Sequence, residues 1–231
     1  MGLVDWLYPK KCVGCNKKGR YFCWECLRQV RLKTGWICSE CNKMGVRGVV
    51  HLGCKRKYSL DGLVSLLSYK GLVRLGIHRL KYDFLKDVET ELLEILGESL
   101  KIKLKDKREV GLISFLKKKP IVVPVPLYWR RENWRGFNQA EIVGKMLVNL
   151  LGLEMKKILV RKKLTQPQTK LDRRARGENV KRAFEVRKGA LMPERVLLVD
   201  DVWTTGATMR AGGRSLKKAG VKEVWGLSLA R

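Results

Sequence analysis

The chain has 231 residues, 45% of them apolar, which is enough to bury the core of one medium domain beside a small one. Fifty Lys and Arg oppose 22 Asp and Glu, and a formal net charge of +28 favours a polyanionic partner, nucleic acid, over a merely solubilising surface. No run of about 18 apolar residues is present and the first eight residues lack a signal-peptide pattern, so we expect a cytoplasmic protein without a transmembrane helix.

Residues 12–54 contain all seven cysteines. They form three Cys-x2-Cys pairs and one half-pair in which a histidine takes the first place: Cys12 and Cys15, Cys23 and Cys26, Cys38 and Cys41, His51 and Cys54. This spacing lets two side chains bind one tetrahedral Zn2+. Disulfides fit poorly with an odd number of cysteines in a cytoplasmic chain. We therefore predict a zinc-binding module over residues 1–59, with metal supplying much of its folding energy.

The assignment of these ligands to zinc ions has alternatives. A knuckle followed by the start of a helix favours one site built from the first two pairs. The third pair would form a second site with His51 and Cys54, although a surface histidine is an equally good interpretation of His51. An interleaved arrangement, with the first pair joined to the third, stays open. Trp24 and Trp36 can stack on nucleic-acid bases, or they can pack inside the module.

Residues 60–231 are predicted to form a second, larger domain. Apolar residues recur at helical spacing through residues 55–119, which predicts mostly helix there. Lys81, close to the end of the first of these helices, can reach a phosphate, although a solvated lysine is the more common outcome of such spacing.

The apolar run 121–125 predicts a buried strand, with Pro124 at an irregular or terminal position. A basic loop follows, and a helix is expected from near Asn138 to residue 150. Arginine donors between a strand and a helix suit an anion, either a pyrophosphate or a nucleic-acid backbone. The arginines of this loop are Arg130, Arg131 and Arg135.

A strand is expected near residues 158–161, and a long polar, basic segment follows it. So long a stretch inside a compact domain predicts a flexible lid or a loop that contacts DNA. Its basic residues are Lys170, Arg173, Arg174, Arg176, Lys181 and Arg182.

Residues 195–209 combine a strand, two acids, a small loop and a helix. The apolar run 196–199 predicts a buried parallel strand, and Asp200 and Asp201 follow it. The loop opens a helix over residues 207–218, whose first N–H groups attract phosphate. The acids suit sugar hydroxyls or a bound Mg2+. We therefore predict a sugar-phosphate site whose loop residues are Thr204, Thr205, Gly206, Ala207 and Thr208.

This stretch resembles the 5-phosphoribosyl-1-pyrophosphate (PRPP) motif of type I phosphoribosyltransferases. The resemblance implies an α/β fold with a central parallel sheet. It also implies that Asp200 and Asp201 hold the ribose hydroxyls of Mg2+-PRPP and that residues 204–208 hold the 5′-phosphate. Lys81, Arg130 or Arg131 would then contact the pyrophosphate. No residue presents itself as a general base, so catalytic residues stay unassigned.

The paired cysteines, residues 123–126 (Val-Pro-Val-Pro), residues 135–140 (Arg-Gly-Phe-Asn-Gln-Ala) and the PRPP motif together resemble the competence protein F (ComF/ComFC) family. That resemblance implies a zinc-bearing protein that handles single-stranded DNA in natural transformation, beside competence proteins at the inner face of the membrane. The family often has a fourth Cys-x2-Cys where this chain has His51. Two alternatives compete with DNA binding: a phosphoribosyltransferase with an unknown acceptor, and a non-catalytic PRPP sensor.

Overall fold

The core of the protein is a parallel β-sheet of four strands in the order β1-β6-β5-β2. The computed structural model describes residues 9–32, 35–82, 86–162 and 183–231, so the basic segment from Lys170 to Arg182 lies outside the described residues. The predicted α/β class with a central parallel sheet is confirmed. The strands of this sheet are β1 (Gly62–Leu67), β2 (Ile121–Pro124), β5 (Arg195–Val202) and β6 (Glu223–Ala230).

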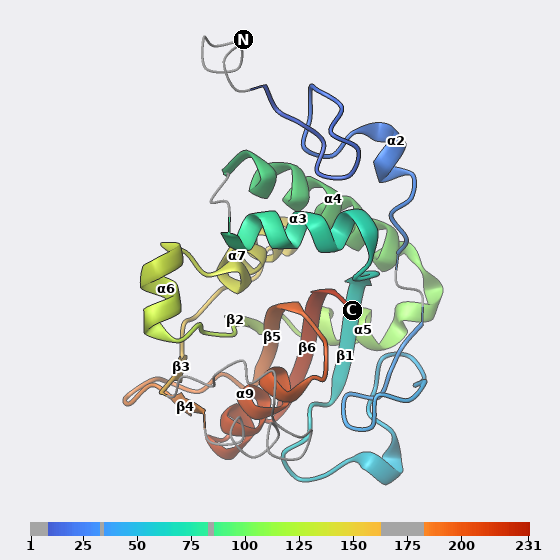
Figure 1. Cartoon of the computed structure of the whole chain (residues 1–231). Coiled ribbons are helices and arrows are strands. Elements are labelled where there is room, and N and C mark those ends of the chain that lie inside the picture. The colour runs from blue at the N-terminus through green and yellow to red at the C-terminus, as the bar shows by residue number, and fades with distance from the viewer. Residues whose placement is uncertain (1–8, 33–34, 83–85, 163–182) are drawn as a thin grey trace.

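Helices cover both faces of the sheet (Figure 1). One face carries α4 and α7, with α3 packed on α4, and the other face carries α9. A short antiparallel pair, β3 (Leu159–Arg161) and β4 (Phe184–Val186), lies against α9. The helices are α2 (Trp24–Leu27), α3 (Gly71–Tyr82), α4 (Lys86–Lys105), α5 (Val110–Lys117), α6 (Trp129–Arg135), α7 (Gln139–Leu151) and α9 (Ala207–Lys218), with 3-10 turns η1 (Leu52–Cys54) and η2 (Lys107–Glu109). None of the described helices is long and apolar enough to cross a membrane.

Residues 55–119 are mostly helical, as predicted, in α3, α4 and α5, but Gly62–Leu67 form the strand β1 where helix was expected. All six of its residues are buried, and it pairs in parallel with β6 from Gly62 opposite Trp225 to Leu67 opposite Ala230. A strand covered on both faces has a continuous apolar sequence instead of an alternating one. Periodicity alone cannot separate such a run from a buried helix, so the sequence pattern does not reveal this strand.

The second correction concerns the arginines after β2. They lie in helix α6 instead of a loop, and α6 ends at Gly136 in a left-handed conformation with φ of +73°. The helix predicted next is confirmed as α7, where Asn138 caps the N-terminus by accepting from the N–H of Ala140 at 3.0 Å. Pro124 is the last residue of the edge strand β2, where a missing N–H is tolerated.

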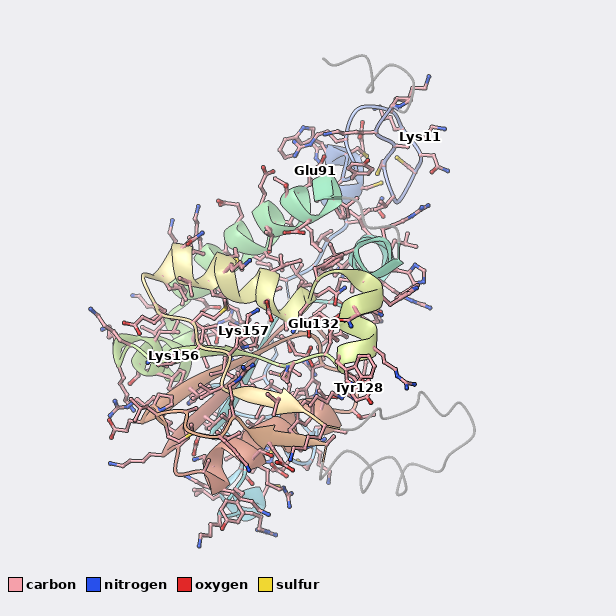
Figure 2. All side chains as sticks on the ribbon, turned by 90° about the vertical axis from the view of Figure 1, so that its left-hand side faces the viewer. Lys11, Glu91, Tyr128, Glu132, Lys156 and Lys157 are labelled. Carbon is pink, nitrogen blue, oxygen red and sulfur yellow. The ribbon has the colours of Figure 1, made fainter. Side chains whose placement is uncertain are left out.

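The first Cys unit, residues 9–32, is docked on α3 and α4. The backbone N–H groups of Tyr21 and Phe22 donate to the Glu91 carboxylate at 3.2 and 3.0 Å, and Figure 2 shows Glu91 beside this unit. The Phe22 ring is buried against α3 at Gly76, where an added Cβ would lie 2.6 Å from the ring. The unit therefore shares its core with the larger domain.

The second Cys unit, residues 35–59, is docked elsewhere, near β1 and α9 (Figure 1). Its Trp36 donates from Nε1 to Glu109 at 3.0 Å, and Glu109 also forms a buried ion pair with Lys103 at 2.6 Å. Trp36 is thus a packing residue, one of its two predicted roles. Both units join the larger domain through backbone hydrogen bonds and side chains, and the division at residues 59 and 60 stays a prediction.

Candidate metal centres and anion site

The first Cys unit brings four thiols together. The Sγ atoms of Cys12, Cys15, Cys23 and Cys26 all lie within 4.8 Å of one another. Four thiolates around one Zn2+ at about 2.3 Å would stand roughly 3.8 Å apart, and the Sγ atoms of Cys15 and Cys23 are 3.6 Å apart. The donor set fits a structural zinc site, with the pairing that the sequence favoured.

The second Cys unit gathers Cys38, Cys41, Cys54 and His51 in the same way. The Nε2 atom of His51 lies 2.8 Å from the Met44 carbonyl oxygen. A carbonyl only accepts, so Nε2 carries the proton and Nδ1 keeps its lone pair for a metal. Nδ1 lies 3.5 Å from the Sγ of Cys41. His51 therefore faces the cluster, and the surface-histidine interpretation does not fit.

One thiol in each unit is prepared for metal binding by the backbone around it. Burial opposes ionisation of Cys12, but N–H groups of Cys23, Cys15 and Gly14 lower its pKa to about 6. Burial likewise opposes ionisation of Cys38, while N–H groups of Cys41, His51 and Glu40 lower its pKa to about 7. The thiolate is the form that binds zinc, so these two thiols are the readiest ligands at neutral pH, whereas burial and neighbouring thiols raise the pKa of Cys26 to about 12.

The acid pair lies near the carboxyl end of β5 and meets a lysine from α3. Lys81 forms an ion pair with Asp201, and both side chains are mostly buried. Burial, followed by the charge of Asp201, raises the pKa of Asp200 well above its ordinary value, while Lys81 opposes that rise. Two carboxyls with a single lysine suit an additional cation or a set of ligand hydroxyls. The structure thus joins Lys81 to the acid pair, a contact that spacing alone could not predict.

The predicted loop lines a small cavity between β5 and α9. The cavity has a volume of about 30 Å³ and is lined by Asp200 and residues 202–209, which include the five predicted loop residues. Gly206 has a φ of +77°, and an added Cβ would lie 2.1 Å from the ring of Trp203. The turn therefore requires glycine twice over, for its backbone conformation and for the close approach of the indole.

Gly206→Ala should destabilise the protein and remove anion binding at this loop. A left-handed alanine costs about 1–2 kcal/mol, and the clash with Trp203 adds roughly 1–3 kcal/mol. Gly189→Ala is the matched control, because its φ of +74° is similar and nothing lies within 4 Å of the added Cβ. Urea unfolding and phosphate titration of both variants check this. Equal losses in the two variants would show that the close approach of Trp203 does not shape the loop.

The other predicted anion contacts lie on α6. The guanidinium of Arg130 lies over the Trp129 ring at 5.2 Å, and Arg135 donates to Gln139 at 3.3 Å. Arg131 belongs to the same helix. Strands β2 and β5 are parallel neighbours, so α6 leaves the sheet at the edge that carries the acid pair. Within the described residues, Lys81 is the predicted contact that touches an acid of the pair.

Three residues that the sequence did not indicate surround the loop. Trp203 donates from Nε1 to Asn42 at 3.2 Å, and Arg210 lies over the Trp203 ring at 5.4 Å. Burial lowers the pKa of Arg210, and the charge of Glu40 opposes this. Asn42 comes from the second Cys unit, far away in sequence. No local pattern marks such a contact, so only the tertiary structure could find it.

Exposed tryptophans lie beside arginine on the basic surface. Trp24 on α2 is 67% exposed, and Trp129 and Trp134 on α6 are 55% and 60% exposed. The Arg20 guanidinium lies 5.2 Å from the Trp24 ring. Figure 2 shows α6 with Tyr128 and Glu132 on the side of the molecule that faces the viewer. Further exposed basic residues of the first Cys unit are Lys11, Lys17, Lys18, Arg28 and Arg31.

Comparisons with known proteins agree with this architecture. A family model described as a double zinc ribbon domain matches residues 3–55, so the module is a zinc-binding one. Competence protein F of Haemophilus influenzae is 31% identical over 95% of this chain and 97% of its own length. DNA utilization protein YhgH of Salmonella typhimurium is 30% identical over 88% of each chain. Competence protein ComFC of Streptococcus pneumoniae is 34% identical over 47% of each chain. With a similarity that spans nearly its full length, the chain belongs to the competence protein F family.

Proposed function

We propose that this protein binds single-stranded DNA during natural transformation, and that residues 200–208 bind a phosphoribosyl ligand, PRPP with Mg2+. Relatives carry the names competence protein and DNA utilization protein, which supports a role in DNA uptake. The net charge of +28 supports a polyanionic partner.

The observation that carries the DNA proposal is the pairing of exposed tryptophans with arginine. Trp24 and Trp129 each present most of an indole to solvent, and each has a guanidinium close to its ring. Unpaired bases stack on such rings, whereas paired bases in a duplex are not free to do so. Lysines and arginines around Trp24 can follow the phosphate backbone.

Trp24→Ala and Trp129→Ala should each weaken binding of a labelled oligothymidine by about tenfold, because one stacked base contributes about 1–3 kcal/mol. Neither change alters charge, so the slope of log affinity against log salt should stay the same. Fluorescence anisotropy at several salt concentrations measures both quantities. Leu191→Ala, at a residue that is 87% exposed, is the control. Wild-type affinity in both tryptophan variants would refute stacking at these two sites.

The phosphoribosyl site is supported by the acid pair, by Lys81 and by the loop at the start of α9. The acids can hold Mg2+ and ribose hydroxyls, Lys81 can contact the pyrophosphate, and the start of α9 attracts the 5′-phosphate. Calorimetric titration with PRPP in Mg2+ tests this directly, and absence of heat would refute it. Release of pyrophosphate with an added base would reveal a transferase. An altered DNA affinity with PRPP bound would reveal a sensor.

The location that fits this role is the cytoplasm, at the inner face of the membrane, beside other competence proteins that deliver the imported strand. The cysteines are arranged as metal ligands, which suits a reducing compartment. Fractionation of competent cells, with and without DNA, tests this location.

A further inference from the structure

The knuckle of the second Cys unit, residues 38–42, holds the loop of the anion site. Asn42 accepts from Trp203 and donates to the Thr205 carbonyl oxygen at 3.4 Å. Arg210 of α9 also bonds to the knuckle: its Nη1 lies 3.2 and 3.4 Å from the carbonyl oxygens of Ser39 and Glu40. Its other terminal nitrogen donates to the Thr205 carbonyl.

These contacts fix the peptide that joins Thr205 to Gly206. Its carbonyl oxygen is bound by Asn42 and Arg210 together. The peptide is planar and trans, so the Gly206 N–H must point the opposite way, away from the knuckle. The orientation of an N–H at the start of α9 is therefore set by Asn42 of the knuckle together with Arg210 of α9.

The knuckle can do this only while its own shape is fixed. Asn42 has a φ of +60°, which is uncommon for a residue with a side chain. Hydrogen bonds between Cys38 and Lys43 and between Asn42 and Cys38 close the turn. Zinc bound by Cys38 and Cys41, which flank residues 39 and 40, would hold the two accepting carbonyls in place. A site of three thiolates with one histidine also carries a net negative charge beside Arg210.

The unit is also anchored to the body of the domain. Trp36 is bonded to the buried Glu109, and the Ser39 hydroxyl lies 3.5 Å from the Leu60 carbonyl oxygen. The second Cys unit therefore connects the body of the domain to the loop. The first Cys unit meets α3 and α4 instead, through Glu91 and Gly76. The two zinc centres thus have different neighbours.

We propose that the second zinc centre positions the sugar-phosphate loop through Arg210 and Asn42. Zinc bound at this centre and ligand bound at the loop would then each increase the affinity of the protein for the other. The inference rests on the proposed phosphoribosyl site for its ligand. By thermodynamic linkage, the factor by which zinc raises the affinity for the ligand equals the factor by which the ligand raises the affinity for zinc.

Arg210→Met tests the connection with both zinc ions still bound. It should lower the affinity for Mg2+-PRPP about tenfold, which is within the usual range of coupling between sites. It should also speed hydrogen exchange of the backbone amides over residues 203–208. Arg214→Met, the same change one turn later in α9, is the control and should do neither. Arg210→Lys should restore part of the affinity, because one carbonyl can still be bound.

Zinc release gives an independent readout. With wild-type protein in a chromogenic chelator, Mg2+-PRPP should slow the loss of one zinc ion and leave the other unaffected. This protection should vanish in Arg210→Met. If Arg210→Met binds Mg2+-PRPP as tightly as wild-type protein and its hydrogen exchange over residues 203–208 is unchanged, the inference is overturned. If wild-type protein binds no PRPP, the proposed ligand is wrong, and the exchange measurement still decides whether Arg210 orders the loop.

Discussion

Asp201→Asn should abolish binding of Mg2+-PRPP while the protein stays folded. The carboxylate pairs with Lys81 and stands beside Asp200, and an amide can neither bind Mg2+ as strongly nor hold the lysine by charge. Losing one hydrogen bond to a charged group costs about 1.5–3 kcal/mol. Because the change also removes a carboxylate ligand of Mg2+, affinity should fall by at least about 100-fold, as measured by calorimetry.

Stability should change little in this variant. Burial, the largest cause of the raised pKa of Asp200, is unchanged by this substitution, which removes only the contribution of the Asp201 charge, and the amide introduced at position 201 can still accept a hydrogen bond from Lys81. We expect a loss of about 1 kcal/mol in urea unfolding. Asp106→Asn is the matched control, because it removes the carboxylate of an ion pair with Arg108 away from the site. Undiminished binding in Asp201→Asn would show that the acid pair has no part in ligand binding.

Wild-type protein should contain two zinc ions, and Cys12→Ser and Cys38→Ser should each contain one. Both cysteines are buried in the structure, so the two changes are matched. Structural zinc contributes on the order of 10 kcal/mol to the folding of small modules. Each variant should therefore lose the order of its own Cys unit, and a strong chelator should unfold both units in wild-type protein.

Metal analysis with hydrogen exchange separates the two centres. Cys12→Ser should expose the amides of Tyr21 and Phe22, which are bonded to Glu91. Cys38→Ser should expose amides of the knuckle, residues 38–42. A zinc-free wild-type protein that keeps these amides protected would rule out metal as the source of order.

The features that the sequence predicted are those encoded locally. The helix over residues 207–218, the helix that begins near Asn138 and the Cys-x2-Cys pairs each depend on neighbours a few residues apart, and the structure contains all of them. The predicted loop around Gly206, whose φ is +77°, likewise lies within one short stretch. Such local features can be recognised from the sequence without knowing which distant segment packs beside them.

What the sequence could not predict depends on distant pairs. Strand β1 is a strand because β6 lies beside it, and its apolar run is equally compatible with a helix. Lys81 becomes part of the site because α3 ends beside β5. The bond between Asn42 and Trp203 joins two segments that no periodicity relates. Helix α6 differs from the predicted loop because its short, Arg-rich sequence has no apolar stripe that would indicate a helix.

The strand order has a bearing on how the chain is synthesised. Strand β1 is complete early, yet its partner β6 is the last of the four strands of this sheet to leave the ribosome. Until then, six buried residues, Gly62–Leu67, have no sheet to join. Apolar segments that wait for distant partners fold slowly and are prone to aggregate. A nascent chain of this design therefore benefits from chaperones that shelter β1, and from early zinc capture by the two Cys units that precede it.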